Sequence, residues 1–262
     1  MASLGRLVPR VQTASAELIY SNPLLRLSGL LVNSFLLGTL SIQIHIYRTC
    51  FPKDSVALKL LVYFVFAACV ICDLLETLYL IGVSGGVFAS FPQARYLWFA
   101  SPFLGSIIAM LVQFVYCFRI VAIRQTAWPV AGLIGLISVA QGVAAMIWVI
   151  LERAENLNLE TKTLRILVYI WLVGSSVGDV LIAVTITALL RNASVLPQTR
   201  DVLKKIVRLV IETNTLTSLV AILSLLLFAC TTTPASFLTS TMILPGIYAN
   251  TLMVVLNQRA AM

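Results

Sequence analysis

Four carboxylates interrupt stretches of this sequence that are otherwise apolar: Asp73, Glu76, Asp179 and Glu212. A charged side chain at the centre of a bilayer costs roughly 2.5–3.5 kcal/mol on insertion scales, so such residues turn toward the interior of a helix bundle or toward a wet cavity. Asp73 and Glu76 are three residues apart and therefore share one face of a helix. The spacing thus places two acids together inside an apolar segment.

We interpret Asp73, Glu76 and Asp179 as a candidate ligand-binding cluster. If the helices that carry them face one interior, the three acids approach one another. Two like charges in a site of low dielectric cannot both ionise easily, which favours a role in binding a cation, a proton or an amine. The alternative is a set of neutral acids that hydrogen-bond to Asn, Thr or Ser on neighbouring helices, and the sequence leaves both interpretations open.

Glu212 has a cation one helical turn before it. Arg208 precedes it by four residues, a spacing at which opposite charges pair on the surface of a helix. We expect a structural ion pair. The alternative is a switch that breaks when this helix moves.

Uncharged polar side chains also lie within the apolar segments. In membranes such groups often hydrogen-bond across helices and contribute about 0.6 kcal/mol each. Gly174 and Gly178, just before Asp179, would let a neighbouring helix approach closely. We predict a polar bundle interior formed by Asn33, Gln113, Gln141, Asn214, Tyr248 and Asn250.

The composition places these residues in a lipid environment. Of the 262 residues, 60% are hydrophobic and 11% are charged, whereas soluble domains carry about 25% charged residues. A chain this apolar could not cover its own surface in water. The 46 residues from Thr213 to Gln258 hold no charge. As one helix they would be about 69 Å long, more than twice a hydrocarbon core of roughly 30 Å, so they must fold back near Pro234.

We predict an all-α polytopic membrane protein with seven transmembrane helices in a single bundle, residues 27–256. About 20 predominantly apolar residues cross a bilayer, and charge-free stretches of this length locate the spans. The expected location is the plasma membrane or an endomembrane. The predicted spans are about 27–47, 58–81, 96–119, 127–151, 166–190, 206–229 and 237–256.

The distribution of lysine and arginine predicts the orientation. Eleven of them fall on one side of the spans and seven on the other. Since cytoplasmic loops carry the excess of positive charge, the N-terminus is predicted outside and the C-terminus in the cytoplasm. Residues 1–26 then form an extracellular tail and residues 257–262 a short cytoplasmic one. The sequon at Asn192 would stay unmodified, and a glycan there would reverse the orientation.

The net charge of +8 is interpreted as topology and not as a nucleic-acid surface, because the charges sit at the ends of apolar segments. The predicted partners are the lipid bilayer and a small-molecule ligand. One basic run could also attract anionic lipid at about 1 kcal/mol per charge, although plain positive-inside bias explains it more simply. That run is Arg200, Lys204, Lys205 and Arg208.

No catalytic motif accompanies the intramembrane acids. Walker and dinucleotide-binding patterns are absent from the sequence. The sole histidine, His45, lies at the end of the first span, so a multi-histidine metal site cannot form. Cys69 and Cys72 have no second pair and are interpreted as packing residues. We therefore predict no catalytic residue, no metal site and no cofactor.

Several segments resemble a known family of membrane proteins. They are Asn33–Gly38, Gly178–Ile182, Glu212–Ser218, Tyr248–Leu252 and Leu256–Arg259. Together they are similar to a large family of uncharacterised seven-span proteins from mushroom-forming fungi, whose C-terminal half is classed as a domain of unknown function. The resemblance covers nearly the whole chain, and it implies the seven-helix fold and a basidiomycete origin. It implies no activity.

Resemblance to G-protein-coupled receptors stops at the span count and the orientation. Cys117-Phe118-Arg119 stands where those receptors carry Asp-Arg-Tyr at the end of the third span. Their Asn-Pro-x-x-Tyr pattern is absent from the last span, where Pro245 is followed by Gly-Ile-Tyr-Ala-Asn.

Three functional hypotheses remain. The first is receptor- or carrier-like binding of a small cationic or amphipathic ligand near Asp73, Glu76 and Asp179. The second is a membrane-embedded enzyme of secondary metabolism, such as a cyclase of isoprenoid intermediates, which could use two intramembrane carboxyls with one as general acid. The third is a non-catalytic membrane scaffold. The absence of a catalytic motif makes us favour a protein that is not an enzyme.

Overall fold

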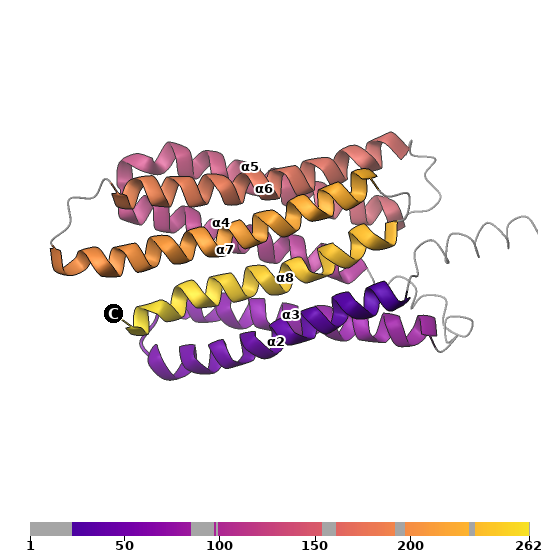
Figure 1. The fold of residues 1–262 in the computed structure, drawn as a ribbon, viewed down its shortest axis with the longest axis horizontal. Coiled ribbons are helices and arrows are strands. Elements are labelled where there is room, and N and C mark those ends of the chain that lie inside the picture. Colours follow the sequence, from indigo (N-terminus) through magenta and orange to yellow (C-terminus); the bar gives the residue numbers. More distant parts are fainter. Residues whose placement is uncertain are drawn as a thin grey trace, which may run out of the picture.

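The structure, a computed structural model, describes residues 23–84, 97, 99–153, 161–191, 197–230 and 234–261. It describes the backbone alone for 23, 83–84, 153, 161, 190, 197–207, 234–236 and 260–261. Most of the predicted N-terminal tail, residues 1–22, lies outside these ranges. No strand is present among the described residues (Figure 1). The elements are α2 Pro23–Cys50, α3 Val56–Ser84, α4 Ala100–Ile123, η4 Gln125–Ala127, α5 Trp128–Arg153, α6 Thr161–Arg191, α7 Pro197–Cys230, α8 Pro234–Asn257 and η5 Gln258–Ala261.

Each of the seven α-helices contains a stretch that is long and apolar enough to cross a bilayer. The prediction of an all-α protein with seven transmembrane helices is therefore confirmed as to fold class, and the chain is an integral, multi-pass membrane protein. The helices have 24–34 residues, which corresponds to about 36–51 Å and exceeds a hydrocarbon core of about 30 Å. The helices are therefore longer than the hydrocarbon core is thick.

Successive helices run in alternating directions along the bundle (Figure 1). One end holds residues 51–55 between α2 and α3, residues 124–127 before α5, and the C-terminus. We call it the C-terminal end. The opposite end, which holds the start of α2 and the start of α8, is called the N-terminal end.

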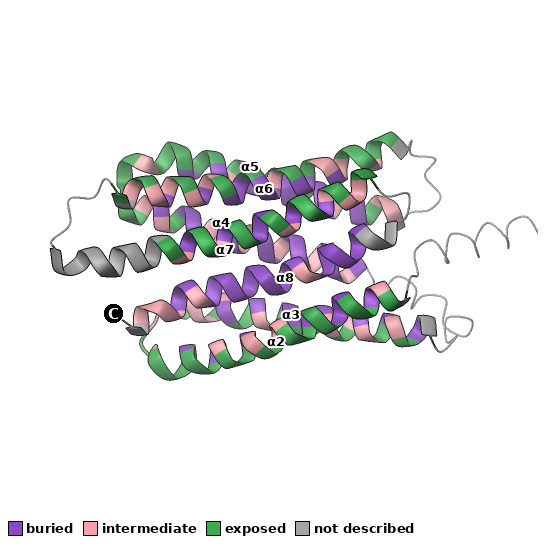
Figure 2. Cartoon of the chain, in the orientation of Figure 1, coloured by how far each residue is buried: buried purple, intermediate pink, exposed green. Residues whose placement is uncertain are grey.

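Helix α8 occupies the centre of the bundle. Of its most apolar window, 83% is buried, against 28–44% in the other six helices (Figure 2). It packs along α2, α4 and α7, with α2 and α3 on one side and α4–α7 on the other (Figure 1). Gly105 of α4 permits this packing, because a Cβ atom there would lie 2.7 Å from Cγ of Pro245.

The outer surface carries large apolar side chains. Among the most exposed are Phe35 of α2, Leu60 of α3, Leu136 of α5 and Val184 of α6. In water such a surface would be an association site, whereas on a spanning helix it is the face that meets the lipid chains. The buried polar residues, by contrast, lie in the interior of the bundle.

Candidate functional site

A buried carboxylate on α6 joins four helices. Asp179 has no exposed surface. Gln113 of α4 donates its Nε2–H to Oδ1 of Asp179 at 3.0 Å, and the hydroxyl of Tyr248 of α8 donates to Oδ2 at 2.8 Å. Gln141 of α5 donates to Oε1 of Gln113 at 2.6 Å, and Ser175 Oγ lies 2.7 Å from the Tyr248 hydroxyl. We call these five residues the Asp179 network.

Two glycines make room for this network. A Cβ atom at Gly178 would lie 3.0 Å from Nε2 of Gln113, and one at Gly174 would lie 2.9 Å from Cβ of Gln141. The predicted close approach near Asp179 is therefore made by side chains of α4 and α5. A larger residue at either glycine would push one of the two glutamines away from its partner.

Both oxygens of Asp179 accept a hydrogen bond from a neighbouring helix. Burying a charged or polar group is costly unless it is hydrogen-bonded, and hydrogen bonds to a carboxylate are stronger than neutral ones. The arrangement thus suits a junction between helices. It leaves Asp179 poorly placed to exchange a proton with a substrate.

The two acids of α3 face α2. Asp73 is half-buried, and its Oδ1 accepts a hydrogen bond from Asn33 at 3.2 Å and one from Ser34 at 2.9 Å. Ser34 Oγ also lies 3.2 Å from Oδ2. One turn along, Glu76 is 3% exposed, and its Oε2 lies 3.9 Å from NH1 of Arg26.

Glu76 is a buried acid whose hydrogen-bonding capacity is unused. Among the described residues, neither of its carboxylate oxygens accepts a hydrogen bond. Arg26 is 2% exposed, and its guanidinium carbon lies 4.7 Å from the centre of the Tyr79 ring. We call Arg26, Asp73, Glu76 and Tyr79 the α2–α3 acid site.

The structure thus brings Asp73 and Glu76 together on α3 and gives Asp179 different partners, on α4 and α8. Which acids meet depends on how each helix is rotated about its axis, and the spacing of residues within one helix does not contain this information. The α2–α3 acid site and the Asp179 network are therefore treated as two sites.

Arg208 and Glu212 lie on the surface of α7. Nε of Arg208 donates to Oε1 of Glu212 at 2.7 Å, and the side chains are 81% and 56% exposed. A pair this exposed contributes little to stability. The side chains of Arg200, Lys204 and Lys205, and the sequon at Asn192, lie outside the described residues.

Asparagines of the predicted polar interior differ in what they join. Asn250 of α8 accepts hydrogen bonds from Thr39 and Gln43 and donates to the carbonyl of Leu36, so it fastens α8 to α2. Asn214, by contrast, donates to a carbonyl of its own helix.

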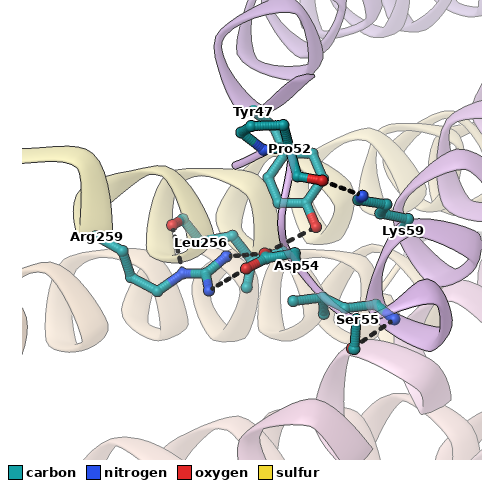
Figure 3. Close-up of polar contacts among 8 residues, drawn as sticks. Tyr47, Pro52, Asp54, Ser55, Lys59, Leu256 and Arg259 are labelled. Atoms are coloured by element: carbon teal, nitrogen blue, oxygen red, sulfur yellow. Dashed lines mark hydrogen bonds and ion pairs between the residues drawn. The ribbon is translucent and has the colours of Figure 1, made fainter. Parts of the chain in front are cut away.

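At the C-terminal end of the bundle, a charged cluster joins η5 to the connection between α2 and α3 (Figure 3). Arg259 of η5 donates from NH2 and NH1 to the two oxygens of Asp54 at 2.6 and 3.2 Å. Its guanidinium carbon lies 4.4 Å from the centre of the Phe51 ring, and the hydroxyl of Tyr47 donates to Asp54 at 2.9 Å. The hydrogen bond from Arg259 lowers the pKa of Asp54 below its usual value. We call these four residues the Asp54 clasp.

Several polar partners in the structure are not among the site residues predicted from the sequence, including Arg26, Asp54 and Arg259. In the sequence, Arg26 and Arg259 contribute only to the charge distribution that predicts the orientation. The signal for Arg26 is its position three residues after the start of α2, because a charged residue inside an apolar helix needs a partner. Residues 54 and 259 are too far apart in the sequence for spacing to pair them.

Comparison with protein families identifies part of the chain. Residues 175–261 match the model of a family of unknown function, DUF6534. No curated protein and no solved structure matches the chain. The matched segment includes Asp179, Tyr248 and Arg259, together with all of α7 and α8. The fungal origin implied by the resemblance stays a prediction, and the findings support a multi-pass membrane protein with a DUF6534 segment.

Proposed function

We propose that this protein binds a small cationic or amphipathic ligand, in the manner of a receptor or a carrier, at the α2–α3 acid site. The observation that supports the proposal is Glu76, a buried carboxylate that accepts no hydrogen bond from the described residues. Eight residues separate Glu76 from the end of α3, which is about 12 Å along the helix. The site therefore lies near the N-terminal end of the bundle, on the extracellular side in the predicted orientation.

The chemistry of the site favours a ligand that carries hydrogen-bond donors. A buried acceptor without a partner costs about 1–3 kcal/mol, and more when it is charged. Arg26 supplies an opposite charge at 3.9 Å, which is too long for a direct hydrogen bond. An ammonium group has three donors and no acceptor. Placed against Glu76, with Asp73 one turn away, it would satisfy the oxygens that Arg26 does not reach.

In this proposal the Asp179 network has a structural and coupling role. Asn250 bonds α8 to α2, and Tyr248, two residues earlier, bonds α8 to Asp179 of α6. A shift of α2 on ligand binding would therefore move α8 against α4 and α6. Such shifts of packed helices are a common way to transmit a signal.

The test measures thermal unfolding of the full-length protein purified in detergent, with n-octylammonium as the probe and n-octanol as its uncharged counterpart. At a concentration 100 times the dissociation constant, a ligand stabilises the folded state by about 2.7 kcal/mol. For a chain of this size that corresponds to a rise in Tm of about 5–10 °C. We expect octylammonium to raise the Tm of the wild type by more than octanol does.

Three variants make the test specific. Glu76→Gln and Asp73→Asn should lose the octylammonium effect, whereas Glu212→Gln, which removes a mostly exposed acid of α7, should keep it. If Glu76→Gln does not fold, Asp73→Asn decides. An equal rise in Tm for the wild type and for the α3 variants would contradict the proposal, because the amine would then act through the micelle or elsewhere on the protein.

A further inference from the structure

A groove of about 620 Å³ runs between α6 and α7 toward the C-terminal end of the bundle. Its α7 wall extends from Ile211 to Leu219, and the α6 residues recur every three to four positions, so they form one stripe along that helix. The groove is separate from the α2–α3 acid site. Its α6 wall is formed by Val180, Ala183, Val184, Thr187, Ala188 and Arg191.

The groove opens sideways to the lipid. Val184 is 60% exposed and Leu219 is 58% exposed, so both walls belong to the outer surface of the bundle. Between them lie Ala183 and Ala188, whose short side chains leave a space. Larger side chains at these two positions would fill it. A hydrocarbon chain could therefore enter from the bilayer without passing through water.

The length of the groove matches one leaflet. Val180 and Arg191 are eleven residues apart on α6, which corresponds to about 16 Å. Half of a hydrocarbon core of roughly 30 Å is about 15 Å. A chain lying in the groove would thus extend from the middle of the membrane to the level of the headgroups.

A cation lies at the headgroup end. Arg191 is the last residue of α6 and its side chain is exposed. A guanidinium binds phosphate with two parallel hydrogen bonds. Arg208, across on α7, is already engaged by Glu212. The charge at this end of the groove therefore complements an anionic headgroup, and the apolar part complements an acyl chain.

We propose that the groove between α6 and α7 binds one anionic phospholipid, with an acyl chain along Ala183 and Ala188 and the phosphate at Arg191. This is a defined site, in contrast to the diffuse attraction that a basic run exerts on a charged surface. In the predicted orientation it faces the cytoplasmic leaflet, where anionic lipids are enriched.

The test is native mass spectrometry of the full-length, delipidated protein titrated with dioleoylphosphatidylglycerol and, separately, with dioleoylphosphatidylcholine. We expect one saturable phosphatidylglycerol with an affinity about tenfold above that for phosphatidylcholine. Arg191→Gln should abolish the preference, and Ala183→Leu, which fills the groove, should abolish saturable binding of both lipids. The matched control is Arg48→Gln, which removes an exposed arginine near the same end of the bundle and should bind like the wild type.

Two results would overturn the proposal. One is equal binding of the two lipids by the wild type, which would indicate a general annulus of lipid. The other is a preference in Arg191→Gln as large as in Arg48→Gln, which would place the headgroup elsewhere. If Ala183→Leu does not fold, the comparison of Arg191→Gln with Arg48→Gln decides alone.

Discussion

Replacing Arg259 by alanine should loosen the C-terminal turn from the connection between α2 and α3. Arg259 makes two hydrogen bonds to Asp54, and the side chains are 32% and 17% exposed. Fully exposed ion pairs contribute about 0.2–1 kcal/mol, and hydrogen bonds to charged groups about 1.5–3 kcal/mol. Partial exposure places this pair between the two, so we expect Arg259→Ala to cost about 1–2 kcal/mol. The Tm should fall by about 2–8 °C.

A double-mutant cycle separates the pair from the two residues that form it. Asp54→Asn and Arg259→Ala are measured alone and together, and the pair is expected to couple by about 1 kcal/mol. Arg48→Ala, which removes an exposed arginine near the same end, serves as the control and should leave the Tm nearly unchanged. Additive effects of Asp54→Asn and Arg259→Ala would refute the assignment of stability to the clasp.

The pH dependence gives a second measurement on the same clasp. The hydrogen bond from Arg259 lowers the pKa of Asp54 in the folded protein, whereas the unfolded chain keeps a value of about 3.9. The stabilisation is therefore fully present above about pH 4 and is lost as the pH falls through the lower folded pKa. The Tm difference between the wild type and Asp54→Asn should shrink below about pH 4. A difference that stays constant down to pH 2 would contradict this account.

Three further predictions concern the bundle and its orientation. Gly178→Leu should crowd Gln113 and cost about 1–3 kcal/mol in thermal or denaturant unfolding, whereas Gly132→Leu, at a glycine with nothing within 4 Å of the added Cβ, should be neutral. Tyr248→Phe removes a hydrogen bond to a buried carboxylate and should cost about 1–3 kcal/mol, while Tyr63→Phe on the exposed surface of α3 should change little. Expressed in a eukaryotic host, the protein should show no glycosidase-sensitive shift; a shift lost in Asn192→Gln would place that loop in the lumen.

Hydropathy was sufficient to predict the helices, because each apolar stretch is a local property of the chain. It did not predict how far the helices extend into polar sequence. Helix α7 begins at Pro197, nine residues before the predicted span, and α2 begins at Pro23, so that Arg26 lies within a helix. Hydropathy detects the part of a helix that meets lipid, whereas polar turns beyond the bilayer resemble loops.

The pairing of polar residues was predictable only where it is local. Arg208 and Glu212 are four residues apart on one helix, and their contact follows from helical geometry. The partners of Asp179 lie on α4 and α8, and that of Glu76 lies on α2. Such contacts depend on helix rotation and packing over the whole bundle. The sequence indicated which residues needed partners, but not which partners they have.

The central position of α8 has a consequence for biosynthesis. The ribosome makes this helix after the other six, yet it is the common neighbour of α2, α4 and α7. Until it is inserted, the polar groups of α2 and α6 that bond to Asn250 and Tyr248 face either lipid or one another. The earlier helices therefore form an incomplete assembly that a late, mostly buried segment must enter. Termination of translation before residue 234 would leave six inserted helices without their shared core, a product that quality control should recognise and degrade.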